Sequence, residues 1–148
     1  TPTPSPTPTA TPSSCGATPS NVDVKNSFDL SSPGPQVVLN TEGGYQAMQF
    51  TTTSNPGYQG NFVFAATVGT ADVAEMAWVS NCPGEQVPVT KCYGLGTSTI
   101  SVQWSQDGRL ACELKPNTTY YLNVGPLPGR DCGKACSWIR NIQTNGKP

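Results

Sequence analysis

The chain has 148 residues, six cysteines, no histidine and a formal net charge of −1. Charged residues make up 11% of it, against roughly 25% in an ordinary soluble domain, so its polar surface must consist mainly of hydroxyls and amides. Without a basic cluster or an apolar run near the ~20 residues of a membrane span, the sequence predicts neither nucleic-acid binding nor membrane insertion.

Residues 1–14 contain only Thr, Pro, Ser and one Ala. Their alternating prolines favour an extended polyproline II segment, which at ~3.1 Å per residue would reach about 40 Å. This composition is typical of a stiff linker or an O-glycosylated stalk. We therefore expect a tail or linker at 1–14 and a disulfide-bonded domain at 15–148, with sugar acceptors at Thr1, Thr3, Ser5, Thr7, Thr9 and Thr11.

After Cys15, short apolar segments of period two alternate with turn residues, and no stretch of ten residues has a helical period. Strands are predicted at Val22–Leu30, Val37–Leu39, Tyr45–Thr52, Asn61–Val68, Ala74–Ser80, Ser98–Ser105, Tyr120–Val124 and Trp138–Ile142. Regular short strands without helices between them predict an all-β fold. We expect an immunoglobulin/fibronectin-like or jelly-roll β-sandwich of about seven to eight strands.

The alternation also predicts which side chains share a face. Ile100, Val102 and Trp104 should face one way, with Ser101, Gln103 and Ser105 on the other side of the same strand. In the segment AEMAWVS, Met76 and Trp78 should lie together, opposite Glu75.

The run LKPNTTYYLNV, residues 114–124, resembles the L-x-P-x-T-x-Y-x-x-x-V segment of fibronectin type III domains and related sandwiches. That resemblance implies a tyrosine corner, in which Tyr120 bonds back to the preceding loop. The longer span from Gln46 to Trp138 resembles modules of bacterial secreted and surface proteins of unassigned function. Both likenesses imply an architecture and not an activity.

Six cysteines in a small, loop-rich chain favour an oxidising compartment, so a secreted, extracellular or cell-surface location is expected. Short spacings favour local bridges Cys82–Cys92 and Cys132–Cys136, which would leave Cys15 to pair with Cys112. This is one of 15 connectivities. A zinc site is disfavoured, because the chain has neither His nor a CxxC pair.

Candidate catalytic groups are sparse. The chain lacks His, the commonest general base, and the segment Gly94-Leu95-Gly96 lacks the third glycine of a dinucleotide fingerprint. We expect no enzyme activity, cofactor or metal. Nine carboxylates are spread along the chain without a shared motif: Asp23, Asp29, Glu42, Asp72, Glu75, Glu85, Asp107, Glu113 and Asp131.

Two functions fit these observations. The first is an extracellular structural subunit that assembles with other copies of itself into a filament or surface layer, its Thr/Pro tail extended against a neighbouring copy. The alternative is a carbohydrate-binding or adhesive module joined by its linker to a secreted enzyme. In that alternative, glycans would bind through exposed aromatic rings with Gln59, Asn61 and Asn123 nearby. The predicted stacking residues are Tyr58, Tyr93, Tyr121 and Trp138.

Overall fold

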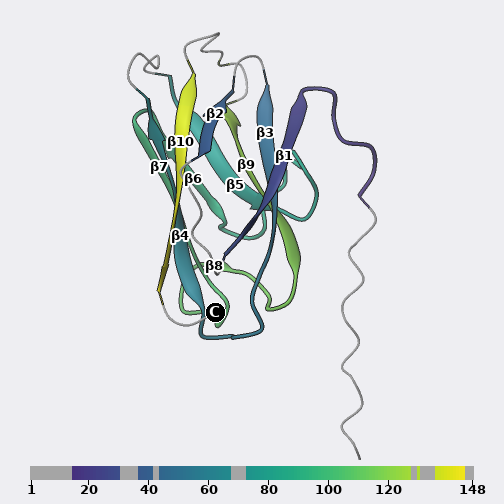
Figure 1. Cartoon of the computed structure of the whole chain (residues 1–148), viewed down its shortest axis with the longest axis vertical. Coiled ribbons are helices and arrows are strands. Elements are labelled where there is room, and N and C mark those ends of the chain that lie inside the picture. Colours follow the sequence, from purple (N-terminus) through teal and green to yellow (C-terminus); the bar gives the residue numbers. More distant parts are fainter. Residues whose placement is uncertain are drawn as a thin grey trace, which may run out of the picture.

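Two five-stranded sheets pack face to face in the computed structural model, which describes residues 15–30, 37–41, 44–67, 73–127, 130 and 136–145 (Figure 1). Sheet A has the strand order β1-β3-β9-β5-β6, and sheet B the order β2-β10-β4-β7-β8. The strands are β1 Val22–Asp29, β2 Val37–Asn40, β3 Tyr45–Thr51, β4 Gln59–Ala66, β5 Glu75–Ser80, β6 Tyr93–Gly96, β7 Thr99–Ser105, β8 Cys112–Glu113, β9 Thr119–Pro126 and β10 Ser137–Asn145.

Eight of these strands pair as a nested set. Strand β2 pairs with β10, β3 with β9, β4 with β7 and β5 with β6, all antiparallel. Two further antiparallel pairs complete the sheets. Strand β9 pairs with β5 in sheet A, and β10 pairs with β4 in sheet B. In this pattern the first strand of the eight pairs with the last, and the second with the second-last. A long hairpin wound into two layers has this pairing, so the sandwich is a jelly roll.

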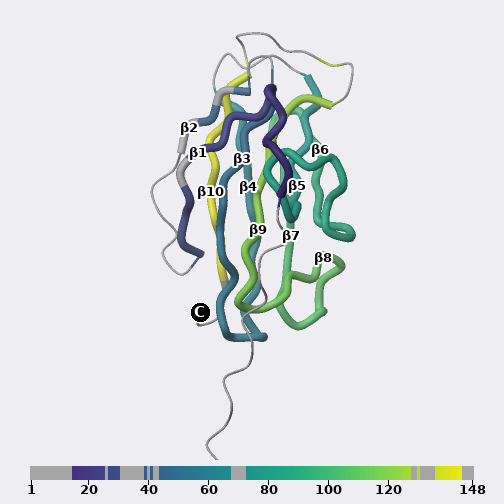
Figure 2. Tube along the Cα trace, turned by 90° about the vertical axis from the view of Figure 1, so that its right-hand side faces the viewer, coloured from purple at the N-terminus to yellow at the C-terminus, as the bar shows by residue number. Residues whose placement is uncertain are grey.

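The other two strands lie at opposite edges. Strand β1 adds to sheet A in parallel beside β3, and the two-residue strand β8 adds in parallel to β7. In Figure 2, β1 and β2 lie at one side of the sandwich and β6 and β8 at the other. The described residues thus form ten strands where about seven to eight were expected. The sequence pattern missed β6 and β8, because one has glycine at alternate positions and the other has only two residues.

Alternating side chains from both sheets fill the space between them, as the period of two predicted. Ile100, Val102 and Trp104 are fully buried. Phe62 stacks on Trp104 with ring centroids 5.6 Å apart and meets Phe50 edge-on at 5.2 Å. Aromatic pairs of this kind contribute beyond the apolar area they bury. The centre of the sandwich is therefore specified by large, well-oriented rings.

Strand β5 has Met76 and Trp78 on one face, opposite Glu75, as predicted, but that face points away from the core. Its core side carries Ala77, Val79 and the buried Glu75, while Trp78 lies on the outer face of sheet A. Trp78 is nevertheless buried, because its indole N–H donates to Glu85 O at 2.7 Å and its ring meets Tyr45 edge-on. A loop thus covers this face, and the burial of Trp78 does not mean that it lies between the sheets.

Glycines at alternate positions let β6 lie directly against β7. A Cβ atom at Gly94 would overlap the carbonyl oxygen of Ser101, and one at Gly96 would overlap that of Thr99. Tyr93 and Leu95, on the other face, are 52% and 56% exposed. The Gly94-Leu95-Gly96 run is explained by this close approach of two backbones.

The disulfides connect other partners than those predicted. Cys15 is bonded to Cys82, and Cys92 to Cys112, with Cα–Cα distances of 5.5 and 4.6 Å. The predicted pairs Cys82–Cys92 and Cys15–Cys112 are wrong, because Cys92 points into the core and Cys82 lies near the surface. The Cys92–Cys112 bridge instead links the start of β6 to β8 across the two sheets.

The third predicted bridge falls partly outside the described residues. Cys136 is disulfide-bonded, and its proposed partner Cys132 lies outside them. So do the Thr/Pro tail with its proposed glycosylation positions, and the carboxylates Glu42, Asp72 and Asp131. Disulfides of this kind are typical of an oxidising, extracellular environment. Within the described ranges, no helix is long and apolar enough to cross a membrane.

Candidate functional site

The outer face of sheet B is uncharged along its three central strands. Side chains that alternate with the core residues of β4, β7 and β10 point away from the sandwich. At the positions with a described side chain, this face carries only amides, hydroxyls and small or branched apolar groups. They are Gln59, Asn61, Val63, Ala65, Thr99, Ser101, Gln103, Ser105, Ser137, Ile139, Asn141 and Gln143.

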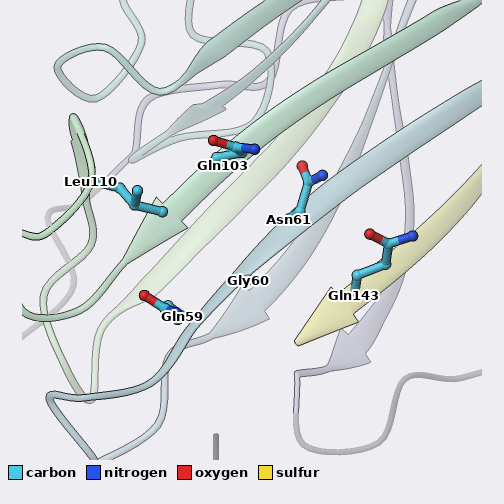
Figure 3. Close-up of a pocket in the computed structure, with 6 residues that line it drawn as sticks. All are labelled: Gln59, Gly60, Asn61, Gln103, Leu110 and Gln143. Carbon is cyan, nitrogen blue, oxygen red and sulfur yellow. The ribbon is translucent and has the colours of Figure 1, made fainter. Parts of the chain in front are cut away.

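Three amides stand in one row across this face. Asn61 on β4 is in register with Gln103 on β7 and with Gln143 on β10. Because residues paired in register on neighbouring strands point to the same side, the three side chains stand next to one another. Figure 3 shows them on three adjacent strands. The row presents several amide donors and acceptors without any charge.

The row lies in a cleft of about 300 Å³ lined by Gln59, Gly60, Asn61, Gln103, Leu110 and Gln143. Leu110 comes from the loop after β7 and is held by its own N–H, which donates to Ser105 Oγ at 3.0 Å. Figure 3 places Leu110 beyond Gln103, at the β7 side of the cleft. In the same loop, Asp107 and Arg109 pair at 2.8 Å, so their charges offset each other.

Asn61 is held in one orientation at the centre of the row. The Ser101 hydroxyl donates to its Oδ1 at 2.7 Å, which leaves the Asn61 amide nitrogen to donate to a ligand. Gln103 and Gln143, on either side, are exposed, so their longer side chains can rotate toward a ligand. The site thus has a fixed centre and two adaptable flanks.

The floor of the cleft is closely packed at Gly60. A Cβ atom there would come within 2.8 Å of Trp104 Cζ2, so only glycine lets the buried indole lie directly beneath this part of β4. Trp104 in turn packs against Tyr58 and Phe62. A floor built on three aromatic rings should keep the amide row in place when a ligand binds.

The four predicted stacking residues do not form a binding strip. Tyr58 and Trp138 are buried, and the Tyr58 hydroxyl donates to Leu30 O at 2.8 Å, so neither ring can stack on a sugar. Tyr93 and Tyr121 belong to sheet A, with the Tyr121 hydroxyl 3.4 Å from Gln49 Oε1. The position of an aromatic residue in a loop or near a cysteine does not predict whether its ring is exposed, because the segments that cover the ring cannot be recognised from its neighbours in the sequence.

The amides named with those aromatics have different positions. Gln59 and Asn61 line the cleft, whereas Asn123 is buried under the loop that covers sheet A. Gln103, Leu110 and Gln143 were not recognised as site residues. The outward alternation of Gln103 was visible in the sequence, but the register that aligns it with Asn61 and Gln143 was not.

Ionisable groups are buried elsewhere in the sandwich. The Thr41 hydroxyl donates to the Glu75 carboxylate, whose oxygens lie 2.8 and 3.1 Å away. Burial raises the pKa of Glu75, and the hydrogen bond from the Thr41 side chain offsets part of that rise. Burial likewise lowers the pKa of Arg140, whose guanidinium lies 4.4 Å from the centre of the Phe28 ring.

Neither group lines the cleft. Among the described residues, no three or more His, Cys, Asp or Glu side chains gather closely enough to hold a metal ion.

No protein-family model, no curated protein and no solved structure matches the chain.

Proposed function

We propose that the domain is a non-catalytic carbohydrate-binding module of an extracellular protein, and that it binds an uncharged polysaccharide on the outer face of sheet B. The observation that carries the proposal is the row Gln103, Asn61 and Gln143 in a cleft whose described lining residues are all uncharged. Planar amides offer a donor and an acceptor side by side, which matches the neighbouring hydroxyls of a sugar ring.

The electrostatics favour a neutral ligand over an acidic one. The outward positions of the three strands carry no charge, and in the described loop beside the cleft the charges of Asp107 and Arg109 offset each other. An acidic polysaccharide would find no counter-charge here, and its binding would fall steeply with salt if it occurred at all. On this proposal residues 1–14 are the linker to another domain.

The test is affinity electrophoresis of the full chain through gels that contain a neutral glucan, mannan, xylan or galactan. We expect retardation by at least one of them, unchanged between low and high salt. Equal mobility in every gel would contradict the proposal. Turnover of the retained polysaccharide, lost on replacing one carboxylate, would contradict its non-catalytic part.

A second candidate, self-assembly into a filament or surface layer, is favoured by the edge strand β1. This strand is eight residues long and, within the described part of the chain, pairs only with β3. Val24 on it is 47% exposed. An unpaired edge of this length can accept a strand from a neighbouring copy, although the charged pair Asp23–Lys25 restricts which strand fits.

On this second proposal the tail starts from the Cys15–Cys82 bridge and contacts the neighbouring copy. Light scattering and electron microscopy of the full chain and of a variant without residues 1–14 test it. We expect assembly only by the full chain. Assembly by both would exclude a role for the tail, and a monomer at high concentration would exclude self-assembly. Intact mass above 15.5 kDa would support O-glycosylation of the native tail.

A further inference from the structure

We infer that the polysaccharide chain crosses the strands of sheet B, with successive sugar units over Gln103, Asn61 and Gln143. This inference rests on the proposed function and adds the direction and length of the bound segment. It follows from the register, because Asn61 is the direct partner of both other amides. A chain lying along one strand would meet no more than one member of the row.

The spacing of the row suits a sugar chain. Neighbouring strands lie about 4.8 Å apart, so three adjacent strands span about 10 Å between the outer two. The advance per unit in an extended chain of pyranose rings is similar to this strand spacing. One sugar can therefore lie over each strand, with its hydroxyls toward the amide beneath it.

The three positions differ in what they offer. Asn61 has its Oδ1 occupied by the Ser101 hydroxyl, so it should act mainly as a donor. Gln103 and Gln143 are exposed and can turn to donate or accept. Among the described lining residues, Leu110, at the β7 side, has the one apolar side chain, so the C–H face of the sugar over Gln103 also contacts Leu110.

The class of ligand follows from this lining. None of the six residues that line the cleft is aromatic or charged. Recognition must then depend on hydrogen bonds to hydroxyls, which a hydrated single chain presents on all sides. The site is suited to a soluble, neutral polysaccharide, and not to the flat surface of a crystalline one, which is usually bound by stacking on aromatic rings.

The experiment uses the neutral polysaccharide that retards the full chain, and its oligosaccharides from mono- to hexasaccharide, in calorimetric titrations. We expect affinity to rise with length up to about three sugars and then to level off. Gln103→Ala and Gln143→Ala should each weaken binding about fivefold, the loss expected for one hydrogen bond. Asn61→Asp should do the same, because it keeps the acceptor for Ser101 and removes the donor.

Gln49→Ala is the matched control, since Gln49 is an exposed amide on β3 of the other sheet. Its affinity should equal that of the unaltered chain, and all variants should keep the same unfolding midpoint. If the chain binds a neutral polysaccharide but the three variants bind as tightly as the control, this inference is overturned while the proposed function stands. Affinity that levels off at a single sugar also overturns it. If no neutral polysaccharide binds, the proposed function itself fails.

Discussion

The side-chain oxygen of Asn123 accepts a hydrogen bond from the backbone N–H of Gly84 over 2.8 Å. Asn123 lies on β9 and faces away from the core, yet it is fully buried. Its Nδ2 donates to Ser80 Oγ at 2.8 Å and to Trp78 O at 3.2 Å. One amide thus ties the loop after β5 to the outer face of sheet A and keeps Trp78 covered.

Replacing that amide should loosen the loop. Asn123→Ala leaves the Gly84 N–H without its acceptor and removes the hydrogen bond that Ser80 Oγ accepts, and we expect a loss of about 2 kcal/mol in the free energy of unfolding. Urea denaturation followed by tryptophan fluorescence measures it. The control is Asn141→Ala, which removes an exposed amide from β10. Equal midpoints for the two variants would contradict the role given to Asn123.

The contact between β6 and β7 should tolerate no side chain. Gly94→Ala places a methyl group onto the Ser101 carbonyl oxygen, so one backbone must move. We expect a destabilisation of about 2 kcal/mol, at the middle of the range for overpacking. Gly16→Ala is the control, because nothing lies within 4 Å of a Cβ atom there. Thermal unfolding of both variants, compared with the unaltered chain, tests the difference.

The tyrosine corner predicted from LKPNTTYYLNV has its local contact in place. The Lys115 N–H donates to the Tyr120 hydroxyl at 3.1 Å, and the Tyr120 ring is buried. Tyr120→Phe should cost about 1 kcal/mol, because the N–H loses its acceptor. Tyr121→Phe is the matched control on the next residue, whose hydroxyl makes a 3.4 Å contact at the surface. A cost for Tyr121→Phe as large as for Tyr120→Phe would argue against the corner.

Glu75 should make stability depend on pH. Because burial raises its pKa in the folded state above the ordinary value of 4.5, the folded protein holds this proton more tightly than the unfolded chain. Its contribution to stability is full below pH 4.5 and is lost as the pH rises through the folded pKa. Glu75→Gln removes that titration but keeps an acceptor for the Thr41 hydroxyl.

Comparing the Glu75→Gln variant with the unaltered chain isolates the titration of Glu75, because both contain all the other carboxylates. Relative to the unaltered chain, Glu75→Gln should become more stable as the pH rises from 4 to 7. Urea midpoints at several pH values measure the difference. A difference that stays constant with pH would mean that Glu75 titrates alike in both states.

Sequence periodicity located most strands because burial on one face leaves a local trace. Ile100, Val102 and Trp104 alternate with polar neighbours, and the core contains all three. Trp78 broke this rule because a second layer, the loop after β5, buries the outer face as well. A loop folded back over the outer face buries apolar side chains there, and the alternating pattern of β5 does not show that the loop folds back.

The disulfide partners and the strand register could not be predicted from the sequence for a related reason. Short spacings in the sequence predicted local disulfides, but the fold turns Cys92 into the core beside Cys112 and brings Cys82 to Cys15. The amide row depends in the same way on register between residues far apart in the sequence, because Asn61 pairs with Gln103 and with Gln143. Local composition indicated amides and hydroxyls on the surface, and only the topology places three of them side by side.

The disulfide connectivity also determines how the domain would carry mechanical load. A pull on the segment before Cys15 passes through the bridge to Cys82, then along the loop to Cys92 and across to Cys112. Strands β1 to β5 and β6 to β7 lie within the bypassed stretches, so the covalent path puts no tension on them. The load falls instead on β8, β9 and β10. Of these, β9 and β10 are each held by antiparallel neighbours on both sides. Tension applied between the two ends of the domain would thus bypass the cleft strands β4 and β7, while β10, with Gln143, would carry it.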